Sequence, residues 1–326
     1  MIVPSFWAEA RRQIRQGKRQ ITVRRWGWSD TSEADAQAMA ETRADEALAL
    51  AQTDSTVERR ERKVAYNGAQ GVPIREEVLE RHGDTVITRN GYGAKCLNTP
   101  NVLFADVDFD TALPRGLYLT ALCLLAVAVL LPARWLLGSW GWLAGGLIVI
   151  FGTALLARVM QRLNLARQGG PQLAAMARLR AFVQAHPTWA VRVYRTPAGL
   201  RLLATHSPVE PGSAEAQAFF GAVGADPLYV RMCVNQHCFR ARLTGKPWRM
   251  GIDKHLRPSP GVWPVSAERL PEREAWIRHY DARAADFAAC DWIESVGSGA
   301  VHISVQPVVD LHDRVSQALQ TGKPLA

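Results

Sequence analysis

Cysteine is scarce in this 326-residue sequence, and one long stretch is almost free of charge. The five cysteines are odd in number and scattered, which argues against a disulfide framework and indicates a reducing compartment around the soluble parts. No P-loop and no dinucleotide-binding glycine fingerprint occurs, so neither phosphate-binding loop is expected. The first residues lack an apolar run of signal-peptide length, and a hydrophobic content of 48% excludes a wholly disordered chain.

The almost uncharged stretch covers residues 116–157, where Arg134 is the single charged side chain. Its two runs, 116–133 and 135–157, are each long enough, or nearly so, to cross a hydrocarbon core about 30 Å thick. Tryptophans beside Arg134 suit a short turn at one interface. Gly141 and Gly145 would let a helix approach closely, either within the hairpin, which we favour, or in a dimer. Arginines are more numerous on the outer flanks than in the turn. The positive-inside rule therefore predicts two spans of a bacterial inner membrane, with both termini in the cytoplasm and lipid as a partner.

The segments on either side predict an α+β fold, in which a helix-covered sheet is interrupted by the two-helix hairpin. Alternating or continuous apolar runs predict strands at 21–28, 85–89, 94–97, 102–109, 189–194, 200–205, 228–234, 238–243 and 300–305. Helical periodicity and capping residues predict further helices at 6–19, from about 29 to 52, and at 73–81, 171–185, 213–223 and 270–289.

This order of elements divides the chain into five parts. They are a basic helix, strand and acidic helix (1–62), the first part of a cytoplasmic α+β domain (63–112), the transmembrane hairpin (113–160), the second part of that domain (161–250), and a C-terminal loop, helices and strand (251–326).

The segment LFADVDF, residues 103–109, holds the sharpest chemical signal. Side chains alternate along a strand, so Asp106 and Asp108 project from one face. Two such carboxylates repel each other unless a cation lies between them. Mg²⁺ or Mn²⁺, held by carboxylates and substrate phosphates, is what nucleotidyl transfer requires. The alternative is an exposed strand end with no bound ion.

A second dense feature is CFRARLTGKPWR, residues 238–249. Arg240 and Arg242 share a strand face, and Lys246 and Arg249 follow on a turn, so four cations could converge on a triphosphate or a nucleic-acid backbone. Trp248 could stack a base. The alternative is that Arg240 and Arg242 pair with the aspartates across the sheet and the tryptophan fills a core edge. The net charge of +9 suits nucleic acid, nucleotides or anionic lipid alike.

The order of LFADVDFD, a helix, the hairpin VYRTPAGLRLLATH and the segment ADPLYVRMCVNQHCFRARLTGKPWR resembles the archaeo-eukaryotic primase superfamily, including the polymerase domains of bacterial end-joining ligases. The resemblance covers about 102–249 without the hairpin. It implies a primase-palm or RRM-like sheet, with Asp106 and Asp108 as metal ligands and Asp226 as a candidate third carboxylate. Where the family presents a histidine, this sequence has Gly199-Leu200-Arg201, which implies a phosphate-binding arginine and a degenerate or repurposed site.

Two functional hypotheses follow. In the first, the cytoplasmic domain is a metal-dependent nucleotide- or nucleic-acid-binding domain, as in a primase or polymerase. Its metal and catalytic carboxylates are Asp106, Asp108 and Asp226, and its phosphate-binding residues are Arg201, Arg240, Arg242, Lys246 and Arg249. In the second, the chain is a non-catalytic membrane scaffold or accessory protein that binds a cytoplasmic protein partner. The whole chain also resembles two-span transmembrane proteins of proteobacteria, which implies a location and names no activity.

Overall fold

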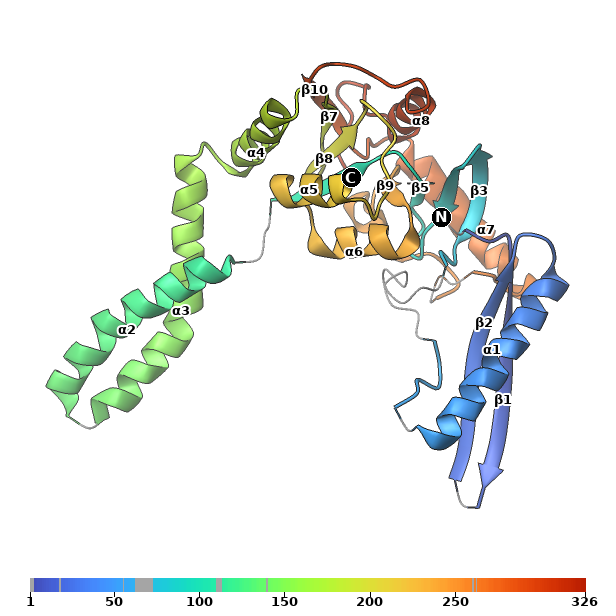
Figure 1. Ribbon diagram of the computed structural model, residues 1–326, viewed down its shortest axis with the longest axis horizontal. Coiled ribbons are helices and arrows are strands. Elements are labelled where there is room, and N and C mark those ends of the chain that lie inside the picture. Colours follow the sequence, from blue (N-terminus) through green and yellow to red (C-terminus); the bar gives the residue numbers. More distant parts are fainter. Residues whose placement is uncertain are drawn as a thin grey trace.

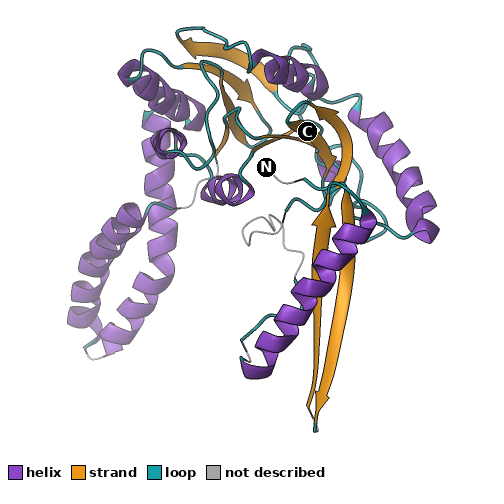
Figure 2. Ribbon diagram, turned by 45° about the vertical axis from the view of Figure 1, so that its right-hand side comes forward, coloured by secondary structure: helices purple, strands orange, loops and turns teal. Residues whose placement is uncertain are grey.

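A computed structural model describes residues 3–17, 19–54, 56–61, 73–109, 113–138, 140–259, 261 and 263–326. It has an α+β body from which two arms project, one of two strands and a helix, the other of two long helices (Figure 1). Figure 2, turned by 45°, shows both arms on the same side of the body. The coarse α+β prediction is confirmed.

The N-terminal arm is a two-stranded hairpin with a helix along one face. β1 (Phe6–Gln16) and β2 (Arg19–Ser29) pair antiparallel over their whole length. α1 (Glu33–Thr53), capped by the Ser32 side chain, buries alanines at three- and four-residue intervals against the strands. Gly27 permits this contact, because a Cβ there would overlap the Ala36 carbonyl oxygen.

The helix predicted at 6–19 is wrong, because this segment is β1. Ala10 and Ile14 are turned toward α1, as is Arg12, which pairs with Asp45 of α1, while Arg11 and Gln13 lie on the opposite face of the strand. Pairing with β2 supplies the hydrogen bonds and the apolar contacts that this alternation needs, and it overrides the helical periodicity of the isolated segment.

The body contains two four-stranded antiparallel sheets rather than the single sheet expected. The first has the order β10 (Asp291–Gly297), β7 (Ala190–Arg195), β8 (Gly199–Ala204), β6 (Phe104–Asp108). The second has the order β3 (Glu77–His82), β4 (Thr85–Arg89), β5 (Lys95–Thr99), β9 (Phe239–Arg242). They meet where β6 lies beside β9.

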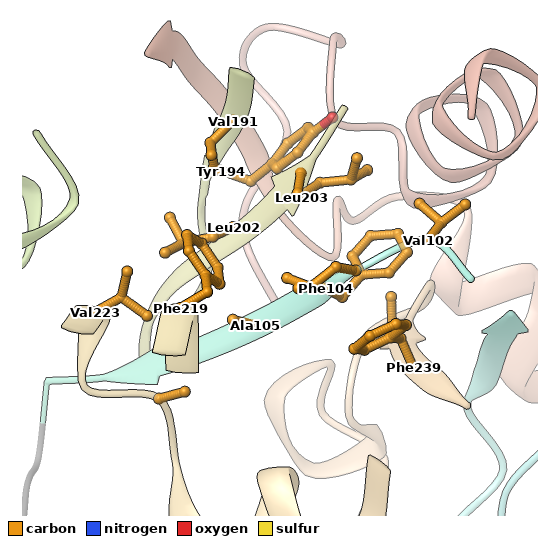
Figure 3. Packing of buried hydrophobic residues seen from close by; sticks show 14 of the residues in the cluster. Val102, Phe104, Ala105, Val191, Tyr194, Leu202, Leu203, Phe219, Val223 and Phe239 are labelled. Carbon is orange, nitrogen blue, oxygen red and sulfur yellow. The ribbon is translucent and has the colours of Figure 1, made fainter. Parts of the chain in front are cut away.

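Five helices flank the sheets: α4 (Pro171–Ala185), α5 (Ala214–Val223), α6 (Pro227–Gln236), α7 (Leu270–Ala284) and α8 (Gln306–Ser316). Two short 3₁₀ turns, η2 (Pro247–Arg249) and η3 (Ala267–Arg269), lie between α6 and α7 in the chain. The main core gathers apolar side chains of both sheets and of the helices, and Figure 3 shows Phe104 of β6, Phe219 of α5 and Phe239 of β9 within it. This core holds β6 rigidly at the centre of the body.

Three further predictions are corrected. Residues 77–82 form strand β3, with a bulge against β4, instead of a helix. The apolar run 228–234 is helical, because Asp226 and Pro227 begin α6 there. The strand expected at 300–305 is absent from this fully described segment, and β10 at 291–297 takes its place beside β7.

The helical arm consists of α2 (Arg115–Leu137) and α3 (Trp140–Arg167), which pack against each other. They follow β6 directly in the chain, so the hairpin comes after the strand that was predicted at 102–109. Both helices are long and apolar enough to cross a membrane, with mean hydropathies of 2.3 and 2.0. Only 6% and 22% of their most apolar windows are buried, unlike the core helix of a soluble protein. Gly141 lies against the Ala133 carbonyl, so the glycines pack the hairpin against itself, as predicted.

Candidate functional site

The first two candidate carboxylates lie on β6, in register with β8. Asp106 is opposite Arg201, and Asp108 is opposite Gly199. The Arg201 Nε donates to Asp106 Oδ1 at 3.0 Å. Gly199 brings the two backbones close together, since a Cβ there would overlap the Val107 carbonyl oxygen. The strand pairing therefore brings an arginine to Asp106 and leaves the space across from Asp108 without a side chain.

Arg201 is fixed on three sides. Besides Asp106, its Nη1 donates to the Arg242 carbonyl oxygen at 2.7 Å and lies 3.5 Å from His312 Nε2. The side chain is only 2% exposed. Burial lowers its pKa, but Asp106 more than offsets this, so the pKa of Arg201 stays above its usual value. With these partners Arg201 is a buried counterion of Asp106, and its predicted role in phosphate binding stays a prediction.

Asp108 is half-buried and has a different environment. Its pKa is raised, first by burial and then by repulsion from Asp106 and Asp226. Lys246 and Arg249 act in the opposite direction and favour the carboxylate. The three carboxylates and two of the predicted cations thus lie within electrostatic reach of one another.

Asp226 is the N-cap of α6. Its Oδ1 accepts from the Leu228 backbone N–H at 3.0 Å and its Oδ2 from that of Tyr229 at 3.3 Å. Its own N–H donates to the Asp106 carbonyl oxygen at 3.0 Å, which ties the start of α6 to β6. Two of the three carboxylates therefore have protein partners already. No group of three or more histidine, cysteine or acidic side chains arranged to hold a metal ion is found in the described ranges, and the predicted metal role of Asp106, Asp108 and Asp226 stays a prediction.

The cations on the 3₁₀ turn have fewer partners. Neither Lys246 nor Arg249 has a carboxylate oxygen within 4.0 Å in the part of the chain that the structure describes. Burial, and then repulsion from Arg242, lowers the pKa of both side chains. Arg242 itself donates to the main-chain oxygens of Thr244 and Ala326. Lys246 and Arg249 are thus partly buried cations that interact with Asp108 at longer range but form no ion pair within 4.0 Å in the described residues.

Arg240 does not join this cluster through its guanidinium contacts. Its Nη2 pairs with Glu76 Oε2 at 2.6 Å, and its Nη1 donates to Asn98 Oδ1 at 3.1 Å. The alternative interpretation expected an ion pair with the aspartates across the sheet; Arg240 does form an ion pair, but its partner is Glu76, which directly precedes β3. Its predicted role in phosphate binding is not tested.

Aromatic side chains flank Lys246. Its ammonium lies 5.5 Å from the centre of the Trp248 ring, and Trp248 makes edge contacts with Tyr92 at 5.4 Å and lies 5.4 Å from the His255 ring. Trp248 keeps 49% of its surface exposed. A half-exposed ring beside unpaired cations offers a stacking surface for a planar group.

A buried polar network behind Arg201 escaped prediction. His312 Nε2 lies 3.8 Å from the Cys290 Sγ, and its Nδ1 lies 3.0 Å from Asp313 Oδ1. Asp313 also accepts from Tyr194 Oη at 2.7 Å and from Arg192 at 2.6 Å. Cys290 and His312 are fully buried, so this cysteine–histidine–aspartate set supports Arg201 from inside the body.

The pKa shifts in this network agree with its geometry. Burial raises the pKa of Cys290, but His312 more than offsets it and the pKa is lowered. Burial lowers the pKa of His312, but Cys290 and Asp313 raise it overall. The sequence predicts a helix start at His312-Asp313, but both residues lie inside α8, which begins at Gln306. Nothing nearby in the sequence signals that Cys290 and Arg201 are their neighbours. A strongly amphipathic α8 was the only available signal that these residues face the core.

No family model, no curated protein and no solved structure matches the chain.

Proposed function

We propose that the chain is a two-span protein of a bacterial inner membrane, whose cytoplasmic body binds a phosphate-bearing ligand of the nucleotide class beside Asp108. The observation that carries the proposal is the pair Lys246 and Arg249, two partly buried cations that have no carboxylate partner in the described part of the chain. Burying cations that repel each other costs free energy, which an anionic ligand recovers on binding.

Each side chain around the ligand has a distinct proposed task. Lys246 and Arg249 bind phosphate oxygens through charge-assisted hydrogen bonds, and Trp248 stacks against the base. Asp108, whose pKa is raised, donates a hydrogen bond to phosphate when it is protonated and repels it when it is ionised. Asp106 is ion-paired with Arg201, which offsets part of the repulsion that its carboxylate would exert on phosphate.

Mg²⁺ or Mn²⁺ remains a prediction for the pair Asp106 and Asp108, and with it the nucleotidyltransferase chemistry that the primase-like resemblance implies. Because Asp106 is ion-paired and Asp226 caps α6, no step of the proposed binding depends on a metal ion.

The test is calorimetric titration of the full-length protein in detergent with a nucleoside triphosphate, with and without Mn²⁺. The double variant Lys246→Ala, Arg249→Ala should weaken binding at least about 100-fold, because each charge-assisted contact contributes about 1.5 to 3 kcal/mol. The double variant Arg231→Ala, Arg278→Ala removes the same charge from exposed positions and should bind normally. Equal binding by all three proteins would overturn the proposal.

The variant Asp108→Asn distinguishes direct binding of phosphate by the cations from binding through a metal ion. If the cations bind phosphate directly, removing this carboxylate strengthens binding without Mn²⁺, since one source of repulsion is gone. If a metal ion bridges Asp108 and the phosphate, the same variant abolishes binding that depends on Mn²⁺.

The scaffold hypothesis is the second candidate. It is favoured by the fact that Arg201 and Arg240, two of the predicted phosphate ligands, already form ion pairs with Asp106 and Glu76. It predicts that the protein binds no nucleotide under any condition of the titration. It also predicts that, in intact cells, one cytoplasmic protein can be crosslinked to the body.

A further inference from the structure

The arm formed by β1, β2 and α1 carries charge of opposite sign on its two components. Residues 6–29 contain seven basic side chains and one acidic one, whereas α1 at 33–53 contains five acidic side chains and one basic one. α1 covers one face of the hairpin through Ala10, Ile14, Ile21 and Val23. The opposite face carries Arg11, Arg15 and Arg24 with one carboxylate, Glu9, so it is net basic, and the helix behind it is acidic. Arg12 and Arg25 lie on the side of α1.

Near the start of β1 the face opposite α1 holds the pairs Trp7–Trp28 and Glu9–Trp26, and toward the turn it holds six side chains in three further cross-strand pairs, which we call the basic face. The pairs are Arg11 with Arg24, Gln13 with Thr22, and Arg15 with Gln20. Arg11, Gln13, Arg15 and Gln20 are exposed, and Thr22 and Arg24 are partly exposed.

Two arginines directly opposite each other repel, and the protein does little to relieve this pair. Arg24 has a carboxylate, Glu9, at 3.7 Å, but among the described residues the Arg11 guanidinium donates to the neutral Gln13 Oε1 alone, at 2.8 Å. Like charges at directly opposed positions destabilise a hairpin. An anionic surface in contact with this face would remove the repulsion.

The position of the arm indicates which anionic surface that is. Figures 1 and 2 show the arm and the α2–α3 hairpin projecting from the same side of the body. Only seven positions separate Asp108, the end of β6, from Arg115, the start of α2. An extended chain of that length spans at most about 25 Å, which limits the distance from this end of β6 to a bilayer that holds α2. Strands of 11 residues extend about 36 Å, so the arm is long enough to reach the bilayer.

We propose that the basic face of the β1–β2 hairpin docks on the headgroups of anionic lipids in the membrane that holds α2 and α3. The proposal goes beyond the nucleotide site and rests on these two helices spanning the bilayer. Charged lipids of a bilayer attract each nearby arginine, whereas zwitterionic lipids do not.

The test measures the distance of the arm from the lipid surface. The full chain, with Cys123→Ser to remove the one exposed native cysteine, carries a donor dye on Gln13→Cys and is placed in nanodiscs with acceptor-labelled headgroups. We expect strong energy transfer in discs that contain phosphatidylglycerol, weak transfer in discs of phosphatidylcholine alone, and loss of the difference at 1 M salt, where screening is nearly complete.

Matched variants assign the effect to the basic face. Each of Arg11→Gln, Arg15→Gln and Arg24→Gln should weaken docking about fivefold. The triple variant Arg231→Gln, Arg278→Gln, Arg314→Gln removes the same charge from exposed positions elsewhere and should leave docking unchanged.

Three outcomes would overturn the proposal. They are equal transfer in both lipids, docking that survives loss of the three arginines, and a chain that enters neither type of disc. If the donor fluorescence does not depend on the lipid but changes when double-stranded nucleic acid is added, the basic face binds nucleic acid instead of lipid. The arginine variants of the arm should bind nucleotide normally whichever of these outcomes is found. Calorimetric titration of the same variants with nucleotide therefore tests the nucleotide site independently of lipid docking.

Discussion

Arg201 and Asp106 face each other across two paired strands, with 3.0 Å between the Arg201 Nε and Asp106 Oδ1, and the arginine is almost completely buried. This ion pair gives the two carboxylates of one strand face different environments. Asp106 has a fixed counterion, whereas burial and two neighbouring carboxylates raise the pKa of Asp108.

The first prediction compares the two aspartates. Asp106→Asn leaves Arg201 buried without its counterion and should lower the free energy of unfolding by about 2 to 3 kcal/mol, somewhat less than for a fully buried pair because one third of Asp106 is exposed. Asp108→Asn removes an unfavourable charge and should leave stability equal or higher at pH 7. Denaturant unfolding followed by tryptophan fluorescence measures both. A larger loss for Asp108→Asn would contradict the assignment.

Part of this site was predictable from the sequence. Alternation along 103–109 correctly placed Asp106 and Asp108 on one strand, and the apolar length of 116–157 correctly predicted two long apolar helices. The counterion of Asp106 is 95 positions away in sequence, and the Glu76 partner of Arg240 is 164 positions away. Local patterns carry no information about such pairs, because tertiary packing alone decides them.

The secondary-structure errors have the same physical origin. The run 228–234 looks like a strand by its apolar content, and the deciding signal, the cap Asp226 with Pro227, lies just before it. Segment 6–19 has helical periodicity in isolation, and only its partner β2 makes the two-residue period stable. Long-range pairing thus overrides local propensity wherever the local signal is mixed.

Gly199 provides the second prediction. Gly199→Ala should destabilise the body by several kcal/mol and weaken nucleotide binding, because the new methyl group would overlap the Val107 carbonyl oxygen and push β8 away from β6. Gly212→Ala is the matched control, since its Cβ would meet no atom within 4 Å. Thermal unfolding of both variants would show the difference, and similar melting temperatures would contradict the strand contact.

The third prediction concerns pH. The pKa of Lys246 lies below its usual 10.5, so its ammonium is lost at lower pH than that of a free lysine, and affinity for phosphate should fall as pH rises toward 10.5. Arg249→Ala relieves repulsion and should move this fall to higher pH, while Asp108→Asn should move it to lower pH. Calorimetric titrations at several pH values would detect the opposite shifts. The unfolded state holds the Lys246 proton more tightly, so this group makes the free energy of unfolding rise with pH in the same window.

The fourth prediction tests the buried network. Asp313→Asn removes the carboxylate that Arg192, Tyr194 and His312 share, and should cost about 3 kcal/mol of unfolding free energy. The pKa of Asp313 is lowered, so its stabilising contribution is present above pH 3.8 and is lost as pH falls through the lowered value. Asp310→Asn, exposed on the same helix, is the control. Equal unfolding free energies for the two variants at pH 7 would mean that the network adds no stability.

The fifth prediction uses the native cysteines to test the membrane spans. Cys123 on α2 is exposed in the structure, and the other four are buried. In a bilayer, lipid covers Cys123, so a membrane-impermeant maleimide should label no native cysteine of the folded protein. On a Cys123→Ser background, Arg134→Cys near the turn should react in intact cells, and Arg278→Cys on α7 only after lysis. Reaction of both in intact cells would contradict the predicted topology.

Because β6 pairs with β8, and the α2–α3 hairpin lies between them in the chain, the steps of synthesis, membrane insertion and folding must follow a fixed order. β6 leaves the ribosome first and has no partner on this edge until the whole hairpin and α4 have been synthesised. If α2 and α3 insert as proposed, the translocation machinery acts on the chain while the first sheet is still incomplete. Failed insertion would place two uncovered apolar helices and an unpaired strand edge in the cytosol together, a combination that favours aggregation and rapid degradation.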